Sequence, residues 1–171
     1  MKLPAPPRFS VEPLGDHDRS AFSCGVPELD RYLHLQAGQD AKRRVAAAFV
    51  MIDPTRRIVG YYTLSSYAIR LAELPQGFAK KLPKYPLIPA TLLGRLAISS
   101  GHQGQKLGSL LLIDALFRSW RNSAQVASVG VVAEAYDDAA VAFYLHHEFL
   151  PLVEHPRKLF LAMGTVEKGF A

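Results

Sequence analysis

The sequence predicts an α/β fold in which helices flank one mixed central β-sheet of about six or seven strands. Strands dominate the first half of the chain, and the second half follows the order strand, loop, helix, strand, helix, strand. In addition, one segment of the second half is an almost unbroken apolar run, as expected for a strand that is buried on both faces. Together these observations indicate an α/β sandwich built around a single sheet.

Length and composition indicate one folded domain over residues 1–171. With 49% hydrophobic and 20% charged residues, the chain is long enough to bury a sizeable core. No run reaches the roughly 18 apolar residues of a membrane span, and the N-terminus lacks the apolar core of a signal peptide. The single cysteine, Cys24, excludes an internal disulfide and a cysteine-built zinc site. We therefore expect a cytoplasmic protein with no membrane partner.

The charge balance is consistent with a polyanionic partner, but it does not require one. The chain has 20 Lys and Arg residues against 15 Asp and Glu residues, a net charge of +5. RNA, DNA or an acidic protein would suit this charge. Solubility alone explains it equally well.

The first half of the chain is expected to form three strands and one helix. Pro13 lies within the first strand and argues for the sheet edge, because proline cannot donate a ladder hydrogen bond. Pro27 suits the first position of the helix, and apolar residues recur three or four positions apart around it. The expected elements are a strand over 9–14, a helix from Pro27 to about Gly38, and the strands of a β-hairpin over 45–52 and 58–66.

The second half opens with an irregular, basic segment over 68–89, in which prolines alternate with lysines and only short helical turns are expected. A near-continuous strand is expected over 125–135. Asp137 and Asp138 then cap a helix that contains Phe143 and Tyr144. Two final strands are expected over 149–153 and 158–163.

The most informative stretch lies between these segments. An apolar strand ending at Ile98 is followed by a loop with glycines at 104 and 108, and then by a long helix. A strand, a glycine-bearing loop and a helix N-terminus together form an anion site, because backbone N–H groups lack helical partners there and the helix dipole is positive. The pattern is neither a Walker A loop nor a dinucleotide motif, and an ordinary strand-to-helix turn would look the same. The expected apolar face of the helix consists of Leu110, Ile113, Phe117 and Trp120.

Residues 95–98 (RLAI), followed by 102–108 (HQGQKLG), resemble the acetyl-CoA pyrophosphate loop of the GNAT acetyltransferase superfamily. In that superfamily a Gln/Arg-x-x-Gly-x-Gly/Ala run follows a central strand. Aligned from Gln103 to Gly108, this chain has Lys106 where the superfamily has its first glycine. A left-handed lysine there would cost about 1–2 kcal/mol, whereas a helical one would add an ammonium group near a phosphate.

Further motifs resemble one branch of that superfamily, the GNAT toxins of type II toxin–antitoxin pairs. They are Cys-Gly-x-x-x-Leu-Asp at 24–30, GYYTLS at 60–65, LGRLA at 93–97 and Ala-Phe-Tyr at 142–144. Membership would imply a toxin that uses acetyl-CoA, without a metal, to acetylate the free α-amine of aminoacyl-tRNA. It would also imply a ribbon-helix-helix antitoxin and a homodimer. Glu148 stands where that branch has a helix-ending glycine, so a different helix end is expected.

The resemblance also implies which residues act. Tyr144 matches the catalytic tyrosine of the family, and a phenol of pKa about 10 can donate a proton to the departing thiolate; a packed aromatic residue is the alternative. Asp138 takes the place of a CoA-facing polar residue, although a helix N-cap explains it as well. Backbone N–H groups around Ala97 and Ile98 would polarise the thioester. The residues implied in acetyl-CoA binding are Leu96, Ala97, Ile98, Gln103, Gly104, Gln105, Lys106, Leu107, Gly108, Ser109, Asp138 and Phe143.

Basic residues are the candidates for contacts to tRNA phosphates. Arg95 is the leading one, because its neighbours place it on the central strand near the expected acetyl group. Each of the others alone would be an ordinary surface charge, and only clustering on one face would form a phosphate track. The full set consists of Lys42, Arg43, Arg44, Lys80, Lys81, Lys84 and Arg95.

Two other functions stay open at this point. A GNAT enzyme that acetylates a small amine or a protein N-terminus would share every acetyl-CoA-binding residue. A non-catalytic module could use the same fold to bind CoA or nucleic acid. Cys24 could be an acyl-accepting nucleophile, but a small structural residue in a turn is the better interpretation. His146 and His147 are adjacent, so they do not share a helix face and form a poor metal pair.

Overall fold

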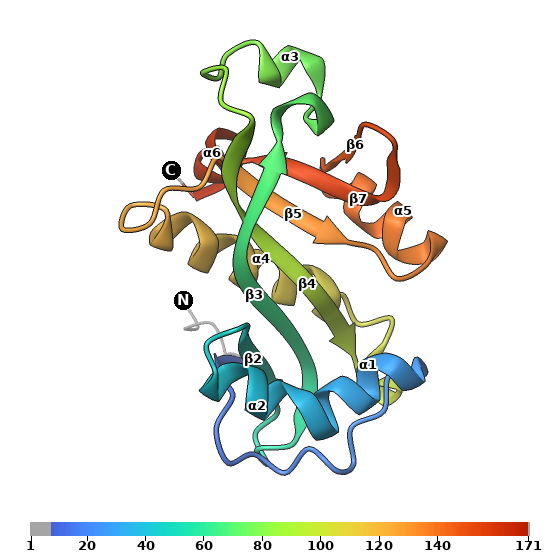
Figure 1. Ribbon diagram of the computed structural model, residues 1–171. Coiled ribbons are helices and arrows are strands. Elements are labelled where there is room, and N and C mark those ends of the chain that lie inside the picture. Colours follow the sequence, from blue (N-terminus) through green and yellow to red (C-terminus); the bar gives the residue numbers. More distant parts are fainter. Residues whose placement is uncertain (1–7, 171) are drawn as a thin grey trace, which may run out of the picture. The chain divides into compact units, whose positions relative to one another are not determined.

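The computed structural model describes residues 8–170 and confirms the predicted fold, a mixed seven-stranded sheet with helices (Figure 1). The strands follow the order β1-β2-β3-β4-β5-β7-β6 across the sheet. β4 and β5 run parallel, with Thr91 opposite Val131, whereas β5 and β7 run antiparallel. The strands are β1 (Ser10–Pro13), β2 (Ala47–Ile52), β3 (Ile58–Arg70), β4 (Leu87–Ile98), β5 (Gly130–Glu134), β6 (Leu150–Leu152) and β7 (His155–Ala162).

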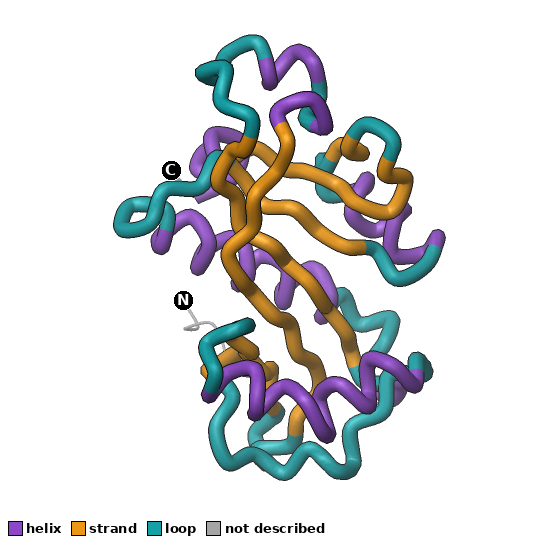
Figure 2. The backbone as a smooth tube through the Cα atoms, in the orientation of Figure 1, coloured by secondary structure: helices purple, strands orange, loops and turns teal. Residues whose placement is uncertain are grey.

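From β4 to β6 the chain alternates between strands and helices, which Figure 2 colours separately. No helix within residues 8–170 is both long and apolar enough to cross a membrane. The helices are α1 (Pro27–Arg31), a π-helical turn (Tyr32–Gln36), α2 (Ala37–Lys42), α3 (Gln76–Ala79), α4 (Leu107–Asn122), α5 (Asp138–His146) and α6 (Met163–Phe170), with 3-10 turns at Leu71–Glu73 and Ser100–His102.

The chain divides into two compact units, each with its own core. The first comprises the residues up to Thr63 together with Leu96–Asp114, and the buried ring of Tyr61 lies in its core. The second comprises Leu64–Arg95 together with the residues from Ala115 onwards, with Phe160 in its core. β3, β4 and α4 each contribute to both units. The expectation of a single domain over residues 1–171 stays a prediction.

The first helical segment begins at Pro27 as predicted but ends later than expected. Gly38 does not end it, because α2 continues to Lys42. Asp40 supports the additional turn by accepting a hydrogen bond from the Tyr32 hydroxyl at 2.9 Å. A side-chain contact within the helix thus outweighs the weak helix propensity of glycine.

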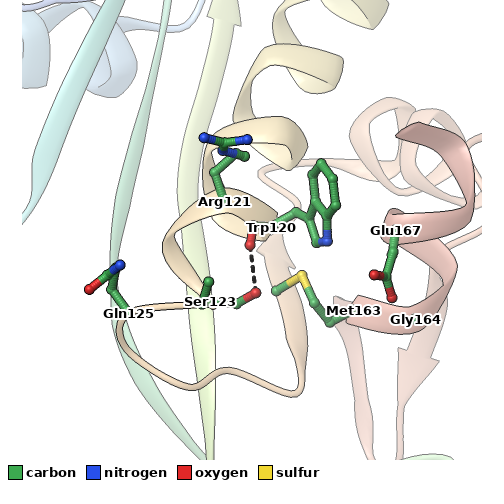
Figure 3. A pocket seen from close by; sticks show the side chains of 8 residues that line it. Trp120, Arg121, Ser123, Gln125, Met163, Gly164 and Glu167 are labelled. Atoms are coloured by element: carbon green, nitrogen blue, oxygen red, sulfur yellow. Dashed lines mark hydrogen bonds between the residues drawn. The ribbon is translucent and has the colours of Figure 1, made fainter. Parts of the chain in front are cut away.

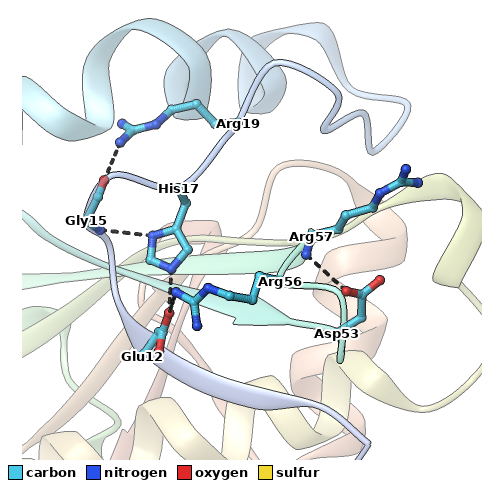
Figure 4. A network of polar contacts seen from close by, with 7 residues as sticks. All are labelled: Glu12, Gly15, His17, Arg19, Asp53, Arg56 and Arg57. Carbon is cyan, nitrogen blue, oxygen red and sulfur yellow. Dashed lines mark hydrogen bonds and ion pairs between the residues drawn. The ribbon is translucent and has the colours of Figure 1, made fainter.

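β1 lies at the sheet edge, as Pro13 predicted, and a polar network holds it there (Figure 4). Glu12 accepts a hydrogen bond from Nε2 of His17 at 2.5 Å and pairs with Arg56 at 2.9 Å. The Gly15 N–H donates to Nδ1 of the same histidine, which assigns the ring proton to Nε2. The hydrogen bond from His17, assisted by Arg56, holds the pKa of Glu12 below its usual value.

The irregular segment between β3 and β4 is shorter than predicted. Residues 68–70 belong to β3 and residues 87–89 to β4, which leaves only 71–86 outside the two strands. A backbone hydrogen bond from Leu71 to the carbonyl of Pro86, 3.2 Å long, closes its base. Prolines near both strand ends interrupt the apolar pattern, which is why the sequence does not show where the strands end.

Helix α4 buries a different face from the one that its spacing predicts. Leu110, Ile113 and Phe117 are 53%, 46% and 42% exposed. The exposed and the buried row both have helical spacing, so spacing alone does not distinguish them. The buried row is also harder to recognise because it contains a polar residue, Ser119, whose hydroxyl donates to the carbonyl of Ala115 at 2.7 Å. The buried row consists of Leu107, Leu111, Leu112, Ala115 and Ser119.

Two further elements differ from the prediction. β5 starts at Gly130 rather than at Gln125, because the residues before it form a loop. The sequence does not predict α6, whose two glycines disfavour a helix. Phe170 of α6 stacks on Trp120 of α4 with ring centroids 5.8 Å apart, so tertiary packing outweighs the low propensity.

Candidate active site

The loop between β4 and α4 has the backbone of an anion-binding turn. Gly104 and Lys106 adopt left-handed φ angles of 82° and 61°. α4 begins at Leu107, and the Leu110 N–H donates to the carbonyl of Lys106 at 3.3 Å. Backbone N–H groups point outward from the first turn of a helix, and the dipole there is positive. Of the two predicted alternatives Lys106 therefore takes the left-handed one, at a cost of about 1–2 kcal/mol.

A segment near the N-terminus anchors this loop within the same unit. The side-chain amide of Gln103 donates to the carbonyls of Cys24 and Ile98, both at 3.0 Å. The Ser100 N–H donates to the carbonyl of Ser23 at 2.8 Å. The Gln103 side chain therefore fixes the loop. Sequence reasoning missed this role, because Gln103 and Cys24 are 79 positions apart and no local pattern links them.

The end of β4 carries a backbone donor on the edge away from β3. The Ser99 N–H donates to the carbonyl of Val59 on β3 at 2.8 Å. Successive N–H groups of a strand point to alternate edges, so the Ile98 N–H points away from β3 and the Ala97 N–H toward it. The pairing of β4 with β5 ends at Leu93. Of the two predicted donors to the thioester, Ile98 is therefore the one whose N–H is available to a ligand.

Tyr144 lies on α5 with its ring buried. The residue is 3% exposed, and its ring contacts those of Phe143 and Phe149. Within residues 8–170 the hydroxyl has no hydrogen-bond partner, yet no polar side-chain atom there is both fully buried and unpaired. The hydroxyl is therefore not completely enclosed. Burial raises the pKa of Tyr144 above its ordinary value, so the phenol stays protonated.

The C-terminal end of α5 fixes the position of Tyr144. Glu148 is left-handed, with φ of 72°, so the expectation of a different helix end is wrong. The Phe149 N–H donates to the carbonyl of Tyr144, and the Glu148 N–H to that of Leu145, both at 3.1 Å. These are the two hydrogen bonds of a Schellman motif. Its usual apolar contact is the one between the rings of Phe149 and Tyr144, whose centroids are 5.2 Å apart.

Glu148→Gly is expected to stabilise the protein by about 0.5–1 kcal/mol. Glycine removes most of the left-handed strain of the folded state, but it also raises the conformational entropy of the unfolded chain, which offsets part of the stabilisation. Lys106→Gly should behave alike at the second left-handed site. Glu148→Ala is the control, since alanine keeps the Cβ atom and with it the strain. Urea unfolding midpoints measure all three variants, and a midpoint of Glu148→Gly at or below that of wild type would contradict the motif.

Asp137, and not Asp138, is the N-cap of α5. The Asp137 carboxylate accepts a hydrogen bond from the Ala140 N–H at 2.9 Å. Asp138 is the first helical residue, its side chain is 98% exposed, and it pairs with Arg157 at 3.3 Å. The N-cap alternative for Asp138 is therefore wrong, and its exposed carboxylate stays a candidate for contact with acetyl-CoA.

The predicted basic residues form two clusters, one in each unit. The cations at 42–44 are exposed at the end of α2, where Arg44 adopts a left-handed φ of 57°. The three lysines within 80–84 are exposed between α3 and β4. Arg95 is half-buried on β4. Each unit thus presents a local concentration of positive charge.

Cys24 is a structural residue. It is 7% exposed, and its N–H donates to the carboxylate of Asp30 at 2.8 Å. Burial, with a further contribution from Asp30, raises the pKa of the thiol to about 11. A thiol that stays protonated at neutral pH is a poor nucleophile, which supports the structural interpretation. No group of three metal-ligating side chains gathers anywhere in residues 8–170.

A pocket of about 530 Å³ lies between the end of α4 and the start of α6 (Figure 3). Trp120, Arg121 and Glu167 are among its lining residues. The Ser123 hydroxyl donates to the carbonyl of Trp120 at 2.6 Å and so closes the last turn of α4. None of the predicted site residues lines this pocket, so it is separate from the residues assigned to acetyl-CoA and tRNA.

The chain is similar to several characterised proteins, although no known family profile matches its sequence. The tRNA-acetylating toxin of Mycobacterium tuberculosis is 34% identical over 146 residues, covering 85% of this chain and 86% of the relative. A Tyr-to-Phe mutant of KacT matches with a TM-score of 0.90 and 30% identity over 96% of this chain and 100% of that chain. AtaT complexed with acetyl-methionyl-tRNAfMet matches with a TM-score of 0.88 and 32% identity, covering 95% and 99%. A Tyr-to-Phe mutant of AtaT, bound to the C-terminus of the antitoxin AtaR and to acetyl-CoA, matches with a TM-score of 0.83 and 28% identity, covering 96% and 99%.

The sheet order, the loop that precedes α4 and these similarities define the class of protein, which is the GNAT-type acetyltransferases. Within that class, the chain belongs to the family of tRNA-acetylating toxins. The resemblance seen in the sequence motifs is thereby confirmed.

Proposed function

We propose that this protein is a toxin that blocks translation by acetylating the free α-amine of aminoacyl-tRNA with acetyl-CoA. The observation that carries the proposal is the β4–α4 loop, whose left-handed turns form an anion site in a chain of the tRNA-acetylating toxin family. The related AtaT has been captured with acetyl-methionyl-tRNAfMet and with acetyl-CoA, which supports both substrates.

The acetyl-CoA contacts follow from the backbone. The diphosphate is bound by the N–H groups of residues 103–109 and by the positive end of the α4 dipole. The exposed ammonium of Lys106 adds a counter-charge. The Ile98 N–H polarises the thioester carbonyl. The family resemblance assigns further contacts with the co-substrate to Leu96, Ala97, Asp138 and Phe143.

In the reaction, the neutral amine attacks the carbonyl carbon of the thioester. An α-amine has a pKa of about 7.7–8, so a useful fraction is neutral at cytoplasmic pH and no strong protein base is needed. The C–S bond then breaks, and the departing thiolate takes a proton from the Tyr144 hydroxyl. The surplus amine proton leaves to water, and water returns a proton to the Tyr144 phenolate, which restores the enzyme. The raised pKa keeps this phenol protonated but makes it a weaker acid, so its proton moves while the C–S bond breaks rather than before.

The partners follow from the family. The complex of AtaT with the C-terminus of AtaR supports an antitoxin partner for this chain. The resemblance implies a ribbon-helix-helix antitoxin and a homodimeric state. Length and composition are the basis for a cytoplasmic location and for one domain over residues 1–171.

Transfer of radiolabelled acetyl groups tests the proposal. The purified protein is incubated with labelled acetyl-CoA and with aminoacyl-tRNA, deacylated tRNA, or aminoacyl-tRNA whose α-amine is blocked. Label should appear only with the free amine. Transfer to small amines or protein N-termini without transfer to aminoacyl-tRNA would favour the alternative GNAT substrates. Acetyl-CoA binding without any transfer would indicate a non-catalytic module.

A further inference from the structure

The segment between β3 and β4 forms a groove of about 660 Å³, and Lys84 is the one of its lining residues that already has a predicted role, as a contact to tRNA phosphates. Its lining residues lie before and after α3 in the chain, and all of them belong to one unit. Figure 1 shows this segment as the loop that extends from the ends of β3 and β4. Leu71, Ala79 and Leu87 contribute apolar atoms to its lining, and Arg70 and Lys84 line it as well. The groove thus combines an apolar surface with two cations.

Tyr85 presents an aromatic ring in this groove, where the residue is 62% exposed. Its backbone is braced, because its N–H donates to the carbonyl of Pro83 at 2.9 Å and the Leu71 N–H donates to that of Pro86 at 3.2 Å. The flanking prolines restrict the chain further. The ring is therefore held on a preformed segment, which lowers the ordering cost of binding.

The charge around the groove is strongly positive. Residues 70–87 contain four cations and a single acid. That acid is Glu73, whose Oε1 atom lies 3.4 Å from Nε2 of His155. Within residues 8–170, no ion pair involves any of the four cations, which are Arg70, Lys80, Lys81 and Lys84. Unpaired cations beside an apolar groove favour a polyanion with flat apolar faces over an apolar peptide.

We propose that this groove binds an unpaired nucleotide of the RNA, whose base stacks on Tyr85 and whose flanking phosphate contacts Arg70 and Lys84; the proposal rests on aminoacyl-tRNA being the substrate. An aromatic platform beside cations is how proteins bind single strands. Stacking requires no base-specific hydrogen bond, so the groove accepts any base. Paired nucleotides do not suit it, because their faces are covered by neighbouring bases.

Variants of Tyr85 separate stacking from charge. Tyr85→Ala should raise KM for aminoacyl-tRNA about tenfold without changing kcat, because one stacked base is lost. Tyr85→Phe keeps the ring and should match wild type, whereas Tyr85→Leu keeps apolar bulk without a π face and should resemble alanine. With a single-stranded RNA as ligand, Lys84→Ala should lower the slope of log affinity against log salt by about 0.7, which Tyr85→Ala should not change. Lys168→Ala removes one exposed cation of α6 and is the matched control.

A second measurement uses a labelled single strand of five nucleotides and a blunt RNA duplex. The single strand should bind, and Tyr85→Ala should weaken it about tenfold, while thermal unfolding stays unchanged because the side chain is exposed. If Tyr85→Ala changes neither KM nor the affinity for the single strand, the proposal that the groove binds a nucleotide is wrong. The proposed acetylation of aminoacyl-tRNA would not be affected by that result. A Tyr85→Ala variant that loses affinity only for the duplex or for a protein partner would overturn the nucleotide-binding groove as well. If the wild-type protein acetylates no aminoacyl-tRNA but Tyr85→Ala still lowers the affinity for the single strand, the nucleotide-binding groove is supported and the proposed function is wrong.

Discussion

Tyr144→Phe is expected to lower kcat by about 10²–10⁴-fold while acetyl-CoA affinity and thermal stability stay at the wild-type level. The substitution removes the hydroxyl that we propose as the proton donor to the departing thiolate. It keeps the ring, which is buried against Phe143 and Phe149. Tyr144→Ala would be a poor test, because deleting a buried aromatic side chain costs about 3–5 kcal/mol and the variant could lose activity by unfolding.

The Tyr144→Phe variant is tested by three measurements: turnover with labelled acetyl-CoA, the affinity for acetyl-CoA by calorimetry, and the thermal unfolding temperature. Tyr136→Phe is the matched control, since it removes a hydroxyl from a residue that is 45% exposed just before α5. Its turnover should equal that of wild type. Near-wild-type turnover by Tyr144→Phe would reject the assignment of the general acid.

The pH profile provides a second view of the same residue. The value of kcat/KM should rise through pH about 7.7–8, where the α-amine loses its proton. On the alkaline side the profile should stay flat, because burial holds the pKa of Tyr144 above its ordinary value and the phenol remains a donor. A fall at or below pH about 10, the ordinary pKa of tyrosine, would show that the phenol ionises there and would contradict this.

The affinity for tRNA is expected to fall by about 10³–10⁴-fold between roughly 50 and 200 mM salt. Seven basic residues are assigned to phosphates, in the clusters at 42–44 and 80–84 and at Arg95. Each neutralised phosphate adds about 0.9 to the slope of log affinity against log salt, because it releases condensed counterions. Filter binding with deacylated tRNA across a salt series measures this slope, and a flat response would exclude electrostatic binding.

Cluster variants then show where the phosphates lie. Replacing the three cations at 42–44 by alanine should reduce the slope by about 2.7, and replacing the three lysines within 80–84 should do the same. The control is the double variant of Arg56 and Arg57, two exposed cations in the turn between β2 and β3. It should leave the slope unchanged. If neither triple variant changes the slope, the assigned track is wrong.

Sequence patterns predicted the elements around the candidate site more accurately than the boundaries elsewhere. β4, its loop and α4 lie in the predicted order, and Asp137 caps α5 as one of two predicted aspartates. Capping and turn chemistry depend on residues that are close in the chain, so a local pattern contains the necessary information. Gly38 misled the prediction because a side-chain contact of Asp40 supports another helical turn.

The sequence by itself predicted the class of enzyme through a family resemblance carried by short motifs, and that resemblance named the loop after β4 and Tyr144 as candidates. Only the tertiary structure decided which row of α4 is buried and how Gln103 anchors the loop. It also decided that Lys106 and Glu148 adopt left-handed conformations. The physical reason is one of magnitude and range. A local backbone preference is worth only about 1–2 kcal/mol, so contacts between residues far apart in the chain can outweigh it. Such contacts cannot be predicted from any short stretch of sequence.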